Sequence, residues 1–239
     1  MINVLIGIQA RSTSTRFPKK IFEEVDGKEV LQHVIDAPKE SSLYVNKFTD
    51  KNKIFCSVAL LIPFGDEPIK AKYSSQNIII EGPENDVLER YYQAMIKVNA
   101  DFIVRITSDC PLLPSYLISK HINVCTKNNF DYASNVDPDV RTCPDGHDVE
   151  VMSRRALSWA NENATTKEDR EHVTKILRSN AIPRGFRIAH IIGHVYNPDY
   201  KISLDTLDDL ITIKDESIKI KECIDKAYKK SGRGSVFRI

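Results

Sequence analysis

Residues 2–8 read INVLIGI, and residues 9–20, QARSTSTRFPKK, follow them without a break. A continuous apolar run of this length is typical of a strand that is buried on both faces, as in a parallel sheet. A second run of this kind, KIFCSVALLI, occupies residues 53–62. Between the two, residues 29–37 have a helical pattern, which Pro38 is expected to end. The start of the chain therefore predicts an α/β fold.

The remainder of the chain continues this alternation of strands and helices. Further strands are predicted over residues 77–80, 102–106, 149–152 and 186–192. Further helices are predicted over residues 84–99, 115–127, 167–179 and 208–229, and one more helix follows the 149–152 strand and extends through Trp159. Such alternation implies a mainly parallel sheet with helices on both faces. Ligands of these sheets bind at the carboxyl ends of the strands. We therefore expect the chemistry in the loops after Ile8, after Ile106 and near Ser203.

The composition excludes several classes of protein. The 239 residues include 34 Lys and Arg and 33 Asp and Glu, which gives a formal charge of +1 and no cationic excess for gripping nucleic acid. No apolar run approaches the ~20 residues that span a bilayer. The first apolar run lacks the cationic lead and the cleavage site of a signal peptide. We expect a single domain over residues 1–239, in the cytoplasm, with neither a nucleic-acid nor a membrane partner.

The cysteines and glycines argue against three further kinds of site. The five cysteines form no C-x-x-C pair and are expected to be free, mostly buried thiols. His190 and His194 have no third ligand nearby in the sequence, so a zinc site is not expected. The only glycines with G-x-G spacing are Gly232 and Gly234, in the C-terminal tail. The sequence therefore has neither the dinucleotide fingerprint nor the Walker A loop.

The loop over residues 9–20 is rich in groups that bind phosphate. It carries four cations, Arg11, Arg16, Lys19 and Lys20, and four successive hydroxyl side chains at positions 12–15. Guanidinium and ammonium groups neutralise phosphate oxygens, and hydroxyl groups donate hydrogen bonds to them. Composition alone fits a solvated cationic loop equally well. The position of the loop at the end of the first strand favours a phosphate site.

The motif A-R-x-x-S-T-R-x-P-x-K in this loop resembles the signature of bacterial cytidylyltransferases that activate sugars for surface polysaccharides. The spore-coat polysaccharide (SpsF-type) branch is closest in appearance, and the 3-deoxy-manno-octulosonate and acylneuraminate cytidylyltransferases are related to it. Six further blocks match in family order: ENDVLERYYQA (84–94), RITSDCPLL (105–113), YASN (132–135), RTCPDGHDVEV (141–151), DREHVT (169–174) and SLDTLDDL (203–210). Together they cover most of the chain.

The resemblance implies a Rossmann-like nucleotidyltransferase fold, that is, a GT-A-like three-layer sandwich. It also implies transfer of CMP from CTP to a sugar acid or a phosphorylated acceptor, with release of pyrophosphate. The nucleotide-binding residues that it implies are Ala10, Arg11, Ser14, Arg16, Lys20, Asp86 and Ser108. Among these, Arg11, Arg16 and Lys20 would stabilise charge on the leaving group. The family has glycine in place of Lys19, which leaves open which of Lys19 and Lys20 reaches the phosphates; the alignment favours Lys20.

Two aspartates match the metal ligands of the family. Asp109 follows the strand over residues 102–106, and Asp205 lies in the S-L-D-T block. Mg²⁺ takes one or two carboxylates together with phosphate oxygens. Each residue also has a structural reading, Asp109 as a turn residue and Asp205 as the N-cap of the following helix. As a pair on one parallel sheet they favour a magnesium site.

The resemblance also assigns an acceptor site, to Arg105, Arg141, Asp145, Asp148, Glu150 and His172. Taken alone, Arg105 also fits a surface ion pair, and His172 fits an exposed helical position. The segment 132–150 is in addition a candidate arm for a homodimer. Relatives that use UTP or GTP usually carry a glycine-rich loop after the first strand, which this chain lacks. The alternatives are a CDP-linked or other NDP-linked product, and a catalytically silent scaffold, against which Lys20, Asp109 and Asp205 argue.

Overall fold

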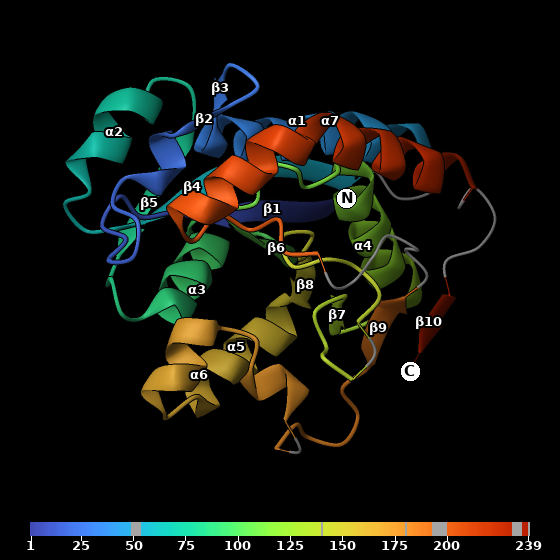
Figure 1. Cartoon of the computed structure of the whole chain (residues 1–239). Coiled ribbons are helices and arrows are strands. Elements are labelled where there is room, and N and C mark those ends of the chain that lie inside the picture. The colour runs from blue at the N-terminus through green and yellow to red at the C-terminus, as the bar shows by residue number, and fades with distance from the viewer. Residues whose placement is uncertain (49–53, 140, 180, 193–199, 231–235, 239) are drawn as a thin grey trace.

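The sheet at the centre of the molecule was examined in a computed structural model, which describes residues 1–48, 54–139, 141–179, 181–192, 200–230 and 236–238 (Figure 1). The sheet has eight strands in the order β10-β9-β7-β8-β6-β1-β4-β5. They are β1 (Ile2–Gln9), β4 (Ile54–Pro63), β5 (Ile78–Gly82), β6 (Phe102–Thr107), β7 (Tyr132–Ser134), β8 (Glu150–Ser153), β9 (Ile188–Ile192) and β10 (Val236–Arg238). His194, Gly232 and Gly234 lie outside the described residues.

The first half of the chain forms the parallel part of the sheet, as predicted. Strand β1 pairs in parallel with β4 on one side and with β6 on the other, and β4 pairs in parallel with β5. The carboxyl ends of these four strands therefore meet at one edge. Strand β8 is antiparallel to both β6 and β7, β7 is parallel to β9, and β10 is antiparallel to β9. The sheet is thus mainly parallel, with antiparallel pairs in its second half.

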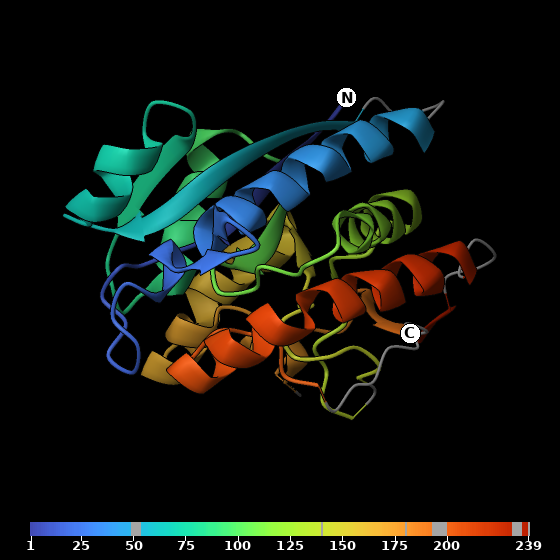
Figure 2. The same ribbon diagram turned by 45° about the horizontal axis from the view of Figure 1, so that its top comes forward.

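Helices cover both faces of the sheet and make it the middle of three layers (Figures 1 and 2). Val4, Ile6 and Ile8 of β1 pack into one core with α1 (Val30–Phe48) and α4 (Ser115–Asn128). Leu5 points to the opposite core, with α3 (Val87–Lys97) and α5 (Arg154–Asn163). This alternation follows from the two-residue period of a strand, and it explains why the run INVLIGI is apolar at nearly every position.

A third, smaller core lies beside the sheet. Helix α7 (Leu207–Lys230) contributes Leu210, Ile213 and Ile220, which pack with Val25 of the short strand β2 (Glu24–Val25). The remaining elements are β3 (Lys28–Glu29), α2 (Glu67–Tyr73), α6 (Lys167–His172) and the 3-10 helices η1 (Lys20–Phe22) and η2 (Ile176–Arg178). No helix in the described ranges is both long enough and apolar enough to cross a membrane.

Two helix boundaries predicted from the sequence are wrong. Pro38 does not end the first helix, which continues to Phe48. A proline removes one internal hydrogen bond, but Val34 and Ile35 before it and Ser41 after it are fully buried, so packing stabilises the turns on both sides. The helix predicted over residues 167–179 is broken at Val173, whose φ of 58° is incompatible with an α-helix. Helix α2 and strand β7 were not predicted.

Candidate active site

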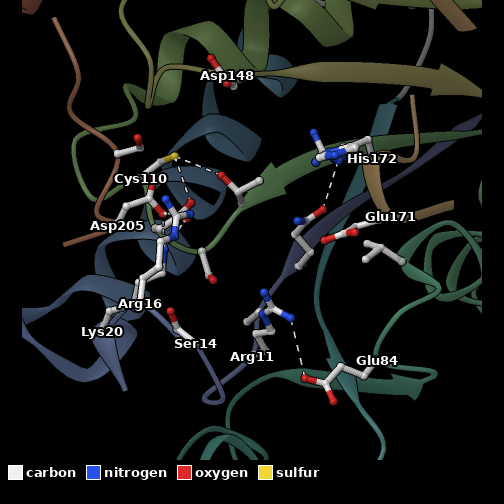
Figure 3. Close-up of a pocket in the computed structure, with 18 of the residues that line it drawn as sticks. Arg11, Ser14, Arg16, Lys20, Glu84, Cys110, Asp148, Glu171, His172 and Asp205 are labelled. Carbon is white, nitrogen blue, oxygen red and sulfur yellow. Dashed lines mark hydrogen bonds and ion pairs between the residues drawn. The ribbon is translucent and has the colours of Figure 1, made fainter. Parts of the chain in front are cut away.

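A cavity of about 380 Å³ lies at the edge where the carboxyl ends of β1, β5 and β6 meet (Figure 3). Most of the predicted site residues line it: Ala10, Arg11, Ser14, Arg16, Lys20, Arg105, Ser108, Asp109, Asp145, Asp148, His172 and Asp205. Asp86, Arg141 and Glu150 are not among the lining residues. The fold thus brings together side chains that lie up to about 200 positions apart in the sequence, at the end of the sheet where ligands of α/β proteins bind.

The cationic loop after β1 is anchored by a residue outside it. The backbone N–H of Ser12 donates to Asp66 Oδ2 at 2.8 Å, and the N–H of Lys19 donates to the carbonyl of Ser12 at 3.1 Å. Asp66 is buried and its other oxygen accepts from the N–H of Ile69, so it also caps helix α2. Helix α2 therefore positions the loop.

Lys20 lines the cavity and Lys19 does not. Lys19 is in the left-handed region, with φ 59°, and its side chain is exposed outside the cavity. Glycine is the residue that adopts this conformation without cost, which agrees with the family having glycine here. Lys20, the next residue, is directed inward, and its Nζ lies 2.8 Å from Asp109 Oδ2 and 3.0 Å from Asp205 Oδ1.

Asp109 and Asp205 converge on this ammonium from two different loops. Asp205 Oδ1 also accepts from Arg16 Nη2 at 2.9 Å. Burial opposes the ionisation of Asp205, but Lys20, Lys201 and Arg16 outweigh it and hold the pKa of the carboxyl below its usual value. The N-cap role is taken by other residues, since Thr206 Oγ1 accepts from the N–H of Asp209 at 3.2 Å. The carboxylate of Asp205 is thus left to face the cavity.

The two carboxylates fit a hard divalent cation. Asp109 follows β6 and Asp205 lies in the loop before α7, and both present carboxylate oxygens within 3.0 Å of the ammonium of Lys20. The described residues contain no group of three or more Asp, Glu, His and Cys side chains suited to holding a metal by themselves. Mg²⁺ does not need such a cage, because it keeps several waters and completes its octahedron with substrate phosphates.

A glycine brings the Asp205 segment close to the rest of the site. A Cβ at Gly146 would lie 2.7 Å from the carbonyl carbon of Ile202, and Gly146 has φ 107°. The loop around it bonds to the segment, because the N–H of Ile202 donates to the carbonyl of Asp145 at 2.8 Å. The N–H of Leu204 donates to the carbonyl of Asp109, also at 2.8 Å. Only glycine fits this approach.

The far end of the cavity is formed around Arg105. Its Nε donates to Gln9 Oε1 at 3.1 Å, and its Nη1 is paired with Glu150. Glu150 is 1% exposed and accepts further hydrogen bonds from the hydroxyls of Tyr132 and Thr174. Burial raises the pKa of Glu150, but Arg105 and these hydroxyls outweigh it, so the pKa is lowered. Glu150 therefore fixes the position of Arg105, and Arg105 lines the cavity.

A second arginine, Arg141, supports the loop that carries Asp148. Arg141 bonds to Asp148 Oδ1 and donates to the carbonyls of Cys143 and Pro144, both at 2.9 Å. Burial raises the pKa of Asp148 to about 6, although Arg141 acts in the opposite direction. Arg141 is thus a support for this loop, while Asp148 and Asp145 face the cavity. Within the segment 132–150, Tyr132–Ser134 form β7 and Glu150 begins β8, and the pairing of this segment with a second copy stays a prediction.

Helix α6 supplies the last side of the cavity. His172 and Glu171 line it at the end of this helix, across the cavity from the Lys20 cluster in Figure 3. The positive φ of Val173 turns the chain sharply after His172, so that Thr174 reaches Glu150. Asp86 lies nearby but caps α3 and accepts from Arg170 Nε at 2.5 Å. It supports the packing of α6 on α3.

Several lining residues were not singled out from the sequence. They are Gln9, Glu84, Asn85, Val87, Arg90, Thr107, Cys110, Glu171 and Ser203. Glu84 pairs with Arg11 at 3.7 Å. Glu84, Asn85, Arg90, Thr107, Cys110, Glu171 and Ser203 belong to the matched blocks, so the resemblance was the signal that could have found them.

Comparison with known proteins decides the family. The family model described as "Cytidylyltransferase" matches residues 5–222. The chain belongs to the cytidylyltransferase family. It is 32% identical over 209 residues to an uncharacterised protein of Methanocaldococcus jannaschii, covering 86% of this chain and 79% of that protein. It is 23% identical over 217 residues to the spore coat polysaccharide biosynthesis protein SpsF of Bacillus subtilis, covering 90% and 86%.

Solved structures of cytidylyltransferases share the fold. The structure of a cytidylyltransferase from Leptospira borgpetersenii matches with a TM-score of 0.79 and 23% identity, over 100% of both chains. A CMP:2-keto-3-deoxy-manno-octonic acid synthetase complexed with CTP matches with a TM-score of 0.61 and 16% identity, over 91% of this chain and 99% of the other. At these identities the likeness establishes the fold, which is the nucleotidyltransferase fold expected from the sequence.

Proposed function

We propose that this cytidylyltransferase transfers CMP from CTP to an anionic small-molecule acceptor and releases pyrophosphate. The observation that carries the proposal is the convergence of Lys20 with Asp109 and Asp205 at the mouth of β1, inside a cavity whose opposite end holds Arg105 and His172. One end suits a triphosphate with its cation, and the other suits an acceptor. The two ends belong to one cavity, which is what a direct transfer between two substrates requires.

In this proposal the protein contributes position and charge. Arg11, Arg16 and Lys20 bind the phosphates, and they stabilise the negative charge that builds up on the departing pyrophosphate. Asp109 and Asp205 would hold Mg²⁺, which when bound would neutralise phosphate oxygens. The acceptor oxygen attacks the α-phosphorus in line with the leaving group. Ser14 and Ser108 line the same end of the cavity and are suited to donate hydrogen bonds to phosphate oxygens.

The chemical class of the acceptor follows from the charged side chains at the end of the cavity that holds Arg105. Arg105 is held in place by Glu150, and a guanidinium fixed in this way binds carboxylate or phosphate in a bidentate manner. His172 adds a group that is cationic when protonated. A sugar acid or a phosphorylated compound satisfies these groups. The similarity to SpsF supports a role in the biosynthesis of a surface polysaccharide.

Two measurements test the proposal. Thermal unfolding with each of the four ribonucleoside triphosphates and Mg²⁺ should show the largest stabilisation with CTP, because a ligand that binds only the folded state raises its stability. Pyrophosphate release with CTP and a panel of sugar acids and phosphorylated polyols should then identify the acceptor, and the mass of the product separates a CMP-linked from a CDP-linked compound. A protein that binds none of the nucleotides would be a scaffold, contrary to the proposal.

A further inference from the structure

A buried arginine lies at the third corner of the cavity. Arg90 of α3 is 3% exposed and lines the cavity together with Glu84 and Asn85. Its side chain crosses Gly82, the last residue of β5, and a Cβ on Gly82 would lie 2.6 Å from Arg90 Cγ. The absence of a side chain at position 82 therefore lets the arginine reach this corner.

The guanidinium of Arg90 lacks the partners that a buried cation needs. Within the described part of the chain, Nε and Nη1 are buried and have no hydrogen-bond partner. Two acids, Glu84 and Asp86, act on Arg90 electrostatically, but their hydrogen bonds go elsewhere, since Glu84 accepts from Thr13 at 2.9 Å and Asp86 accepts from Arg170. Burial lowers the pKa of Arg90, and the neighbouring Arg11 acts in the same direction. An unpaired buried charge is costly, so a ligand acceptor in the cavity is the missing partner.

The strand order places this corner away from the phosphate end. Asp109 follows β6, whereas Gly82 ends β5, and β1 and β4 lie between these two strands. Three strand spacings of ~4.8 Å correspond to about 14 Å across the sheet. When Lys20 and the carboxylates hold the triphosphate, Arg90 is in a position to contact another part of the nucleotide. The base is the part that lies farthest from the phosphates.

We propose that Arg90 determines the choice of base by donating two hydrogen bonds, to O2 and N3 of cytosine; this inference rests on the proposed use of CTP. Arginine carries only donors, in a planar fork that matches two adjacent acceptors. Cytosine presents two such acceptors side by side, O2 and N3, which are those that pair with the two parallel donors of guanine. Uracil carries a proton on N3, so it offers one acceptor and turns a donor towards the guanidinium. Arg90 therefore favours CTP over UTP.

The test compares dissociation constants for three probes in the presence of Mg²⁺: CTP, UTP and inorganic tripolyphosphate. The natural chain is expected to bind CTP more tightly than UTP. In Arg90→Met the affinity for CTP should fall about 10-fold or more, as for loss of a bidentate base contact, while tripolyphosphate binding stays unchanged. Gly82→Ala, which displaces the arginine without removing it, should reduce the CTP preference in the same direction. Lys97→Met, at an exposed position of the same helix, is the control and should change nothing.

The outcomes separate this inference from the proposed function. A natural chain with no preference for CTP contradicts both. A preference that survives in folded Arg90→Met overturns the role of Arg90 alone, and so does an equal loss of tripolyphosphate binding, which would make Arg90 a phosphate ligand. Circular dichroism and thermal unfolding establish that each variant is folded. Should Arg90→Met not fold, Arg90→Lys replaces it, because it keeps the charge but not the two parallel donors and is expected to lose the same preference.

Discussion

The Nζ atom of Lys20 lies 2.8 Å from Oδ2 of Asp109, although 89 positions separate the two residues. The contact joins the loop after β1 to the loop after β6, and these strands are neighbours in the sheet. Asp205, from the C-terminal part of the chain, completes the cluster at 3.0 Å. The cluster is the point at which the phosphate-binding loop and the carboxylates meet, and the first two predictions concern it.

Replacement of Lys20 should remove most of the activity. We expect Lys20→Met to lower kcat for pyrophosphate release by about 10² to 10³, the effect of deleting one group that stabilises charge in a transition state. Lys19→Met is the matched control, because Lys19 is exposed outside the cavity, and it should retain activity. Equal losses in the two variants would contradict the assignment of Lys20.

Removal of either carboxylate should weaken the binding of the metal on which activity depends. We expect EDTA to stop pyrophosphate release and added Mg²⁺ to restore it. Asp109→Asn and Asp205→Asn should each require far more Mg²⁺ for half-maximal rate, because a neutral amide is a poorer ligand for a hard cation. Asp208→Asn, at an exposed position in the first turn of α7, is the control. A Mg²⁺ titration that is unchanged in both variants would exclude this site.

The Arg105–Glu150 pair should contribute to stability as well as to position. Glu150→Gln leaves a largely buried guanidinium without its charged partner, so we expect a loss of about 3 kcal/mol in the free energy of unfolding. Tyr132→Phe removes only one hydrogen bond to Glu150 and should cost about 1 kcal/mol. The pKa of Glu150 is lowered in the folded state, so its contribution is present above the unfolded value of 4.5 and is lost as the pH falls below it. Urea unfolding between pH 3 and 7 measures both effects.

Asp148 should produce a pH dependence of the opposite sign. Its pKa rises from 3.8 to about 6 on folding, chiefly through burial. The folded state therefore holds this proton more tightly, and stability is expected to decrease as the pH rises from about 4 through 6, by on the order of 3 kcal/mol. Asp148→Asn should remove this slope. Urea unfolding of the variant at pH 5 and pH 7.5 gives the comparison, and a slope identical to that of the natural chain would contradict the prediction.

Lys19 offers a stabilising substitution. A non-glycine residue in the left-handed region costs about 1 kcal/mol, so Lys19→Gly is expected to raise the free energy of unfolding by up to about 1 kcal/mol, less the entropy that glycine gains in the unfolded chain. The affinity for CTP should not change. A drop in stability, measured by urea unfolding, would show that the φ of 59° is not strained.

The positions of the cationic loop and of Asp109 were predictable because each directly follows a buried strand, and their roles in binding phosphate and metal stay predictions. The run over residues 2–8 defines a buried strand, the cations follow it directly, and Asp109 follows another strand. Pro38 misled the prediction because the breaking effect of a proline is local, whereas the burial of Val34, Ile35 and Ser41 depends on the sheet and on α4. The sequence around Val173 likewise has a helical pattern. The conformation of Val173 is instead associated with the hydrogen bond between Thr174 and Glu150, which is distant in the sequence.

The sequence by itself determined the α/β class, the edge of the sheet at which the cavity lies and the residues that match a family motif. These features depend on residues that are close together in the sequence, namely the apolar runs of the strands and the polar loops that follow them. Only the tertiary structure decided which polar groups face the cavity and which support it. Glu150, Arg141 and Asp86 bond to other side chains, and Arg90 is a buried cation whose Nε and Nη1 have no hydrogen-bond partner among the residues that the structure describes. The reason is physical: the role of a charged group depends on which opposite charges lie within hydrogen-bond reach and on how much water remains around it, and both are set by segments far apart in the chain.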